Sequence, residues 1–209
     1  MRSLLLFILA PLAGLLHAQS DDLAEARPRA PRQDVMDMLI EYLQVRYPEM
    51  PVDGTVLYVS VHRQRLFHVQ NGVLIGEYPI STARNGLGEQ QDSHRTPNGL
   101  HRITDKIGAG VPVGGIFQER RFTGQVLHGD SLGPDLITSR ILWLDGLEPG
   151  VNQGGQVDSH DRSIYIHGTG DEGSIGRPSS HGCIRMRNAD VVRLFDRVPL
   201  GALVVILDN

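Results

Sequence analysis

The stretch TVLYVSVHRQRLFHVQNGVLIGEYPI, residues 55–80, decides the fold class. Apolar and β-branched residues run through 56–61, 65–70 and 73–80, which predicts three strands. The dipeptide Asn71–Gly72 between the second and third strands indicates a hairpin, because both residues tolerate the backbone of a tight turn. Further short strands are predicted at 99–104, 139–144, 162–167 and 202–207. We therefore expect a mainly β protein.

The composition agrees with this expectation and excludes several classes of protein. The chain has 209 residues, of which 24 are Gly and 12 are Pro, and 40% are hydrophobic. This length and composition predict one ordinary globular domain, or one such domain with a small appendage. The formal charge is -4, and Lys106 is the only Lys among 20 basic residues. No basic run with interleaved aromatic residues occurs, so we expect no nucleic-acid partner.

The first 18 residues resemble an export signal. Arg2 supplies a positive charge, and an uncharged apolar stretch follows from Leu4 to Leu16. A membrane-spanning helix needs about 20 apolar residues, so the stretch is short for an anchor, although an uncleaved anchor is the alternative. Export predicts an extracytoplasmic or periplasmic protein that meets the membrane only through this transient segment.

Residues 19–54 are expected to form a linker and an N-terminal helix. The linker, residues 19–33, is polar and rich in Arg and Pro. Asp34 is a candidate N-cap and Pro48 a stop signal. Apolar residues recur at helical spacing between them: Val35, Met38, Leu39, Tyr42 and Leu43.

A second helix is expected near the C-terminus. Asn188 is its candidate cap, and Pro199 ends it. Its apolar face comprises Val191, Leu194, Phe195 and Val198. Two long segments rich in Gly, Pro and polar residues, 81–98 and 105–125, lie between the predicted strands. Segments of this length in a compact domain are usually functional loops or lids.

The residues that carry chemistry lie between 164 and 186. His167 ends an apolar strand, and Cys183, the only Cys of the chain, follows a Gly-rich loop that allows the two side chains to face each other. A thiol needs a neighbouring base or positive charge to become a thiolate near neutral pH, and His167 can be that base. Gly182 removes side-chain bulk beside the Cys, so the amides of Gly182 and Cys183 could bind a developing oxyanion.

Two other interpretations remain for these residues. His167, His181 and Cys183 could bind zinc with His128 or His160, but one residue between His181 and Cys183 is a closer spacing than zinc ligands usually have. Alternatively, Cys183 is an inert core residue. That interpretation leaves unexplained why the only Cys lies beside Gly182 in a Gly-rich loop.

The segments His167–Gly168–Thr169 and Ser180–His181–Gly182–Cys183–Ile184–Arg185–Met186 resemble the active-site signature of the L,D-transpeptidase (YkuD-like) catalytic-domain family. The resemblance extends over about residues 55–208. It is supported by 57–61, 65–67, the Asn71–Gly72 turn, 78–82 and 96–99. It implies a β-sandwich-like catalytic domain with an active-site cleft, and residues 105–125 are then a candidate lid over that cleft.

The resemblance also implies roles for individual residues. The nucleophile of the family falls on Cys183 and its general acid and base on His167. His181, Ser180, Gly182 and Gly168 fall on residues that order the active-site loop or support the oxyanion. Many members carry Asn two residues after the Cys, where this chain has Arg185. Arg185 is a candidate to bind a substrate carboxylate, with a solvated surface charge as the alternative.

The function implied is that of an exported cysteine L,D-transpeptidase. It would act on peptidoglycan stem tetrapeptides through a Cys thioester, release D-alanine, and form cross-links or attach a protein to the wall. An L,D-carboxypeptidase or related hydrolase would use the same thioester, and an inactive wall-binding module is a third possibility. No cofactor and no metal are expected.

Overall fold

The computed structural model describes residues 31–48, 54–129 and 135–209. The predicted export signal, 1–18, and residues 19–30 of the predicted linker lie outside this part of the chain. Two α-helices are present, α1 (Pro31–Arg46) and α2 (Asn188–Arg197), with two short 3-10 helices at Gly155–Val157 and Glu172–Ser174.

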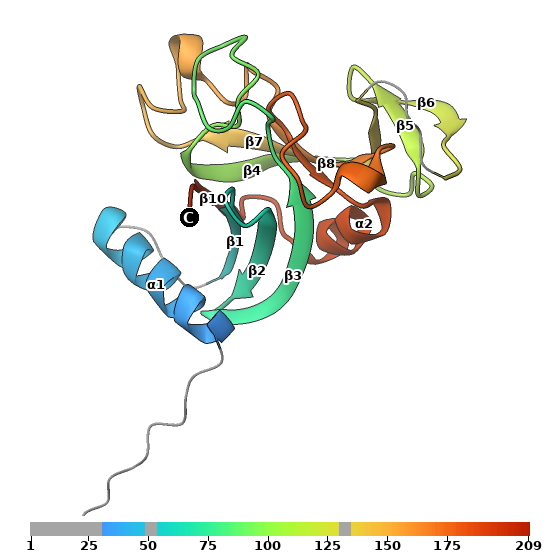
Figure 1. The fold of residues 1–209 in the computed structure, drawn as a ribbon. Coiled ribbons are helices and arrows are strands. Elements are labelled where there is room, and N and C mark those ends of the chain that lie inside the picture. The colour runs from blue at the N-terminus through green and yellow to red at the C-terminus, as the bar shows by residue number, and fades with distance from the viewer. Residues whose placement is uncertain (1–30, 49–53, 130–134) are drawn as a thin grey trace, which may run out of the picture.

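Ten strands form one sheet that closes on itself (Figure 1). The strands are β1 (Thr55–Ser60), β2 (Arg65–Gln70), β3 (Val73–Ser81), β4 (Gly99–Ile107), β5 (Gly115–Gln118), β6 (Arg121–Val126), β7 (Ile137–Gly146), β8 (Tyr165–Thr169), β9 (Ile184–Met186) and β10 (Leu203–Leu207). Their order is β4-β10-β1-β2-β3-β9-β8-β7-β5-β6, and β4 also pairs with β7. This pairing joins eight strands into a continuous ladder, from which the β5–β6 hairpin extends. The mainly β class with few helices is thereby confirmed.

The main core lies inside the closed sheet and is completed by α2. Side chains from opposite strands meet there, among them Leu57, Ile103 and Leu144, each without exposed surface. Val191 and Leu194 of α2 belong to the same cluster. The predicted apolar face of this helix is confirmed, because Val191, Leu194, Phe195 and Val198 are all buried.

Helix α1 covers the outer face of β1, β2 and β10 (Figure 1). Alternate residues of β1 face opposite ways, so Tyr58 packs toward α1 while Leu57 faces the main core. The helix begins at Pro31, earlier than the predicted Asp34, and Pro is well tolerated in the first turn. The predicted apolar face was wrong at Met38, which is 46% exposed, and the residue that packs with Leu39 and Leu43 is Met36.

The seven strands predicted from the sequence are all present, and three others were missed. β9 has three residues, too few for an alternating pattern to be recognised. β5 and β6 lie in the segment 105–125, which was expected to be a loop or lid. Instead, 105–107 complete β4 and most of the remainder forms a hairpin paired to β7. The residues of β6 are exposed except Val126, so no buried face marks this strand in the sequence.

Asn188 does not cap α2 as expected, because the cap position is Arg187. The side chain of Asn188 instead links three segments: its Nδ2 donates to the carbonyl of Thr169, at 2.9 Å, and its Oδ1 accepts from the Thr138 hydroxyl at 2.6 Å. The Glu172 carboxylate accepts the backbone N–H of Asn188 at 2.7 Å. A carboxylate at a helix N-terminus is stabilising, so Glu172 takes over the capping function.

Within the residues that the structure describes, no helix is long and apolar enough to cross a membrane.

His101 of β4 makes folding stability sensitive to acid. Burial lowers its pKa from 6.5 to about 4, and among the described residues its ring bonds to the Gly99 carbonyl and the Ser159 hydroxyl. The unfolded chain binds a proton at this residue below about pH 6.5, whereas the folded chain does not until about pH 4, so stability is lost as the pH falls through that window.

We expect His101 to remove roughly 3 kcal/mol of stability between pH 7 and pH 4, from 1.36 kcal/mol per pKa unit. The midpoint of urea unfolding, measured across this range, should fall less steeply in His101→Gln than in the wild type. His62→Gln, at an exposed position after β1, is the matched control. Equal slopes in His101→Gln and the wild type would contradict this prediction.

Candidate active site

Strands β8 and β9 place His167 and Cys183 on the same side of the sheet. The strands are parallel, with His167 opposite Arg185 and Ile166 opposite Ile184. The two isoleucines face the main core, so the alternate residues Tyr165, His167 and Arg185 face the other side. Cys183 immediately precedes β9 and belongs to the small cluster around Tyr165 on that side. The two predicted catalytic residues are therefore diagonal neighbours on adjacent strands.

The Cys183 thiol is held beside the start of β8. Its Sγ lies 3.4 Å from the backbone N–H of Tyr165, which donates to it, and 3.4 Å from the Ser163 carbonyl, which accepts from it. Burial raises the pKa of the Cys183 thiol to about 12, and Asp135 acts in the same direction. The Cys183 thiol is therefore protonated near neutral pH.

The His167 ring is buried, with 2% of the residue exposed, and its Nδ1 lies 2.7 Å from the Gly168 carbonyl. Burial lowers the pKa of His167, and the cation of Arg185 also lowers it. The ring is therefore neutral near pH 7. With Nδ1 donating to the carbonyl, Nε2 is the basic nitrogen. In the described part of the chain neither ring nitrogen hydrogen bonds to Sγ, so the thiol must turn away from Ser163 before its proton can pass to the ring.

Gly168 is required for the close approach of β7 and β8. A Cβ on this residue would lie 2.6 Å from the Thr138 carbonyl oxygen and 2.7 Å from Oδ1 of Asn188. No side chain fits there, so Gly168 positions the His167 ring through its carbonyl and keeps the strand against β7 and Asn188. The contacts of Gly168 support the position of the His167 ring. The predicted support of an oxyanion by Gly168 stays a prediction.

The loop before the nucleophile is closed by Ser180, which is 1% exposed. Its hydroxyl donates to the Cys183 carbonyl at 2.6 Å and accepts the backbone N–H of Gly182 at 3.2 Å. Gly182 has φ +134°, a conformation that L side chains rarely adopt, and Thr96 binds its carbonyl at 2.9 Å. Because the Gly182 N–H is already bonded to Ser180, it is not free to receive an oxyanion in this arrangement.

Arg185 is buried rather than solvated. Only 3% of its side chain is exposed, and its Nη1 lies 2.9 Å from the Asp135 carboxylate. Its Nη2 donates to three hydroxyls, those of Ser81, Ser174 and Ser179. The alternative of a solvated surface charge was wrong. A substrate carboxylate would have to compete with Asp135 for this guanidinium, which weakens the expected substrate-binding role.

His181 lies apart from the thiol, at the surface. Its side chain is 66% exposed, its Nδ1 is 3.5 Å from the Asp135 carboxylate, and its ring contacts the His94 ring edge-on. It therefore orders the loop through Asp135 and His94 rather than through direct contact with Cys183. Across residues 31–48, 54–129 and 135–209, no group of three side chains is arranged to hold a metal ion.

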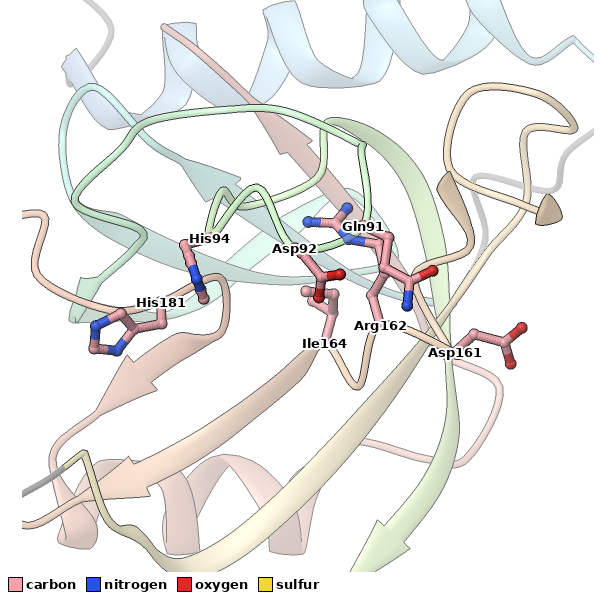
Figure 2. Close-up of a pocket in the computed structure, with 7 residues that line it drawn as sticks. All are labelled: Gln91, Asp92, His94, Asp161, Arg162, Ile164 and His181. Carbon is pink, nitrogen blue, oxygen red and sulfur yellow. The ribbon is translucent and has the colours of Figure 1, made fainter. Parts of the chain in front are cut away.

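A polar pocket of about 280 Å³ includes His181 of the loop that carries Cys183 (Figure 2). The loop between β3 and β4 and the segment before β8 form most of its walls. Its lining residues are Gln91, Asp92, His94, Asp161, Arg162, Ile164 and His181. The segment 81–98, predicted to be a functional loop, thus contributes to a pocket near the thiol.

Arg162 is the pocket residue that the sequence analysis missed. Its Nη2 donates to the Arg95 carbonyl at 2.7 Å, and it acts electrostatically on Cys183, whose pKa it lowers. The prediction from the sequence fell on Arg185, two residues after Cys183. Arg162 instead precedes β8, the strand that carries His167. The position of Arg162 just before this strand is the signal that could have identified it. If His167 is to face Cys183, the start of the strand must also lie close to Cys183.

A model of the L,D-transpeptidase catalytic domain, YkuD, matches residues 54–206. Among curated proteins, the probable L,D-transpeptidase YcfS of Escherichia coli K12 is 26% identical over 172 residues, which are 80% of this chain and 48% of that protein. The probable L,D-transpeptidase ErfK/SrfK of the same organism is 54% identical over 48 residues, 23% of this chain and 16% of that protein. The chain thus spans less than half the length of these two relatives.

Solved structures give a weaker likeness. L,D-transpeptidase 3 from Mycobacterium tuberculosis, crystallised with a faropenem-derived adduct, is 16% identical with a TM-score of 0.47, covering 74% of this chain and 60% of that chain. The match of the family model does not depend on this likeness, because it extends over most of the chain and includes both His167 and Cys183. The resemblance stated from the signature is confirmed: the chain belongs to the L,D-transpeptidase catalytic-domain family.

Proposed function

We propose that this protein is an exported cysteine L,D-transpeptidase that acts on peptidoglycan stem tetrapeptides. The observation that carries the proposal is the placement of Cys183 and His167 on one side of adjacent parallel strands within a catalytic domain of this family. The substrate class comes from the family, and export comes from the apolar segment 4–16, which lies outside the described residues.

Acylation begins with a proton transfer from Sγ of Cys183 to Nε2 of His167. The thiolate attacks the carbonyl carbon at the L-centre of the third stem residue and forms a tetrahedral intermediate. When the bond from this carbon to the D-alanine nitrogen breaks, the nitrogen takes the proton from Nε2 and D-alanine leaves. The product is a thioester on Cys183, and His167 is again neutral.

Deacylation transfers the acyl group to an amine. The acceptor amine loses a proton to His167 Nε2 and attacks the thioester carbonyl, and the sulfur leaves and recovers that proton. The acceptor is an amine of a second stem peptide or of a wall-attached protein. If water reaches the thioester first, the same site is an L,D-carboxypeptidase, which is the second candidate.

The neutral resting pair has a consequence for catalysis. Burial raises the pKa of the Cys183 thiol and lowers the pKa of His167, so the free enzyme holds a neutral thiol and a neutral imidazole near pH 7. This arrangement limits oxidation of the free enzyme, because the thiolate is the species that oxidants attack.

We therefore expect no thiolate in the free protein at neutral pH. The ultraviolet absorbance of the thiolate, taken as the difference between wild type and Cys183→Ala, should remain absent through about pH 9 and appear only as the pH approaches about 12. A thiolate signal already present at neutral pH would show an ion pair with His167 in the resting state and contradict the prediction.

The proposed function is tested by mass spectrometry of the protein mixed with a disaccharide-tetrapeptide. A transpeptidase should form a covalent adduct that has lost D-alanine and then give cross-linked dimer. An adduct that ends as free tripeptide would establish the hydrolase instead. Cys183→Ala, checked for folding by circular dichroism, should form no adduct. Absence of an adduct in the wild type, or turnover by Cys183→Ala, would overturn the proposal.

Replacement of the base should reduce the rate without removing the nucleophile. His167→Asn retains an amide that can donate to the Gly168 carbonyl but lacks the nitrogen that corresponds to Nε2. We expect kcat/KM for adduct formation to fall by about 10²- to 10⁴-fold, the range for a general acid or base. His62→Asn, at an exposed position, is the matched control and should behave as the wild type. A loss of less than tenfold would mean that His167 is not the base.

A further inference from the structure

Arg162 lines the polar pocket, and its guanidinium carries a donor without a partner among the described residues. Its Nη1 is fully buried and has no hydrogen-bond partner among the described residues. Its Nη2 is held by the Arg95 carbonyl at 2.7 Å, so the orientation of the group is defined. Buried polar groups in folded proteins are almost always hydrogen-bonded, and an exception therefore points to a missing partner.

The pocket wall that carries Arg162 continues into the loop of Cys183. A Cβ placed on Gly182 would lie 3.4 Å from the Arg95 carbonyl oxygen, the atom that holds Arg162, and 3.4 Å from Cδ1 of Ile164. The Cys183 thiol in turn donates to the Ser163 carbonyl, between Arg162 and Ile164 in the chain. A ligand in this pocket would therefore lie close to any group that is bound covalently to Cys183.

The other charges around the pocket restrict what Arg162 can bind. Asp92 and His94 line it from the loop between β3 and β4, and Glu89 of the same loop acts on Arg162 electrostatically. Asp161 points outward (Figure 2), with its side chain 80% exposed. No carboxylate forms an ion pair with Arg162 within the part of the chain that the structure describes.

We propose that Arg162 binds a carboxylate of the acyl-donor stem peptide and thereby selects donors that carry this group. The inference rests on the proposed function, which supplies the peptide. A guanidinium with one fixed and one unused nitrogen can bind a carboxylate oxygen through a charge-assisted hydrogen bond. Arg185, by contrast, is already paired with Asp135.

A stem tetrapeptide offers two carboxylates near the attacked carbonyl. One is the terminal carboxylate of D-alanine, and the other ends the side chain of the third residue when this is an amino-dicarboxylic acid. Asp92 lines the same pocket and can pair with an amine, so a ligand with an amine beside its carboxylate fits the charges best. The side-chain terminus of the third residue has this chemistry when that residue is a diaminodicarboxylic acid, because its side chain then ends in both an amine and a carboxylate.

The test measures binding without catalysis. Calorimetric titration of a tetrapeptide into Cys183→Ala gives a Kd that does not depend on the chemical step. The same titration is then made with the double variant that carries both Cys183→Ala and Arg162→Gln. We expect Arg162→Gln to raise the Kd by roughly 10- to 100-fold, the range for a hydrogen bond between charged groups. Arg162→Lys should recover only part of the loss, because its single ammonium cannot hold the Arg95 carbonyl and the ligand in the same geometry.

Two amidated peptides identify the carboxylate. One carries D-alaninamide at its end, and the other carries an amide on the side-chain carboxylate of the third residue. The peptide that lacks the bound carboxylate should bind weakly to Cys183→Ala and show no further loss on Arg162→Gln, while the other peptide should show the full loss. Arg84→Gln, which removes an equal charge at an exposed position, is the control for long-range attraction.

The outcomes separate this inference from the proposed function. If the wild type forms the thioester but Arg162→Gln leaves the Kd unchanged, or weakens all three peptides equally, the role of Arg162 is overturned and the function stands. If the wild type forms no adduct while Arg162→Gln weakens the unmodified peptide and one amidated peptide but not the other, the site stands and the transpeptidase proposal fails.

Discussion

Ile166 of β8 and Ile184 of β9 lie opposite each other in a parallel register, and neither side chain has exposed surface. Their burial in the main core, with Val191 and Leu194 of α2 in the same cluster, determines which way every neighbouring residue on these strands points. A shift of one residue in this register would turn His167 into the core and Ile166 out of it. The arrangement of His167 and Cys183 therefore depends on hydrophobic burial. The isoleucines take the strand positions that face the core, and the candidate active-site side chains take the alternate positions on the opposite face.

The same burial sets the electrostatics of the site. Cys183 and His167 are shifted in opposite directions, the thiol toward higher pKa and the imidazole toward lower pKa, since desolvation disfavours the charged form of each. Two arginines near the site carry charge instead. Arg185 forms an ion pair with Asp135, and Arg162 is a cation that lines the pocket. Formation of a charge on the Cys183 sulfur or on the His167 ring is therefore disfavoured while both groups are buried.

Much of the fold could be predicted because the pattern of apolar residues in its strands repeats over a few neighbouring residues. The strands β1, β2 and β3 show alternating or continuous apolar residues and an Asn71–Gly72 turn, and all three occur where expected. β9 and the β5–β6 hairpin could not be predicted, since β9 has three residues and β6 buries almost none of its side chains. Their existence depends on pairing with β8 and β7, which are distant in the sequence.

For this protein, the sequence by itself determined the mainly β class and the family, because local periodicity and a specific motif carry that information. The same motif predicts His167 and Cys183 as the catalytic pair. The tertiary structure alone decided which arginine is paired with a carboxylate and which keeps a donor without a partner among the described residues. Arg185, two residues after the nucleophile, is buried against Asp135 and three serines, whereas Arg162, distant in the sequence, keeps a buried donor unpaired in the pocket. The reason is that the partners of a charged side chain, and the burial that sets its pKa, come from segments that only folding brings together.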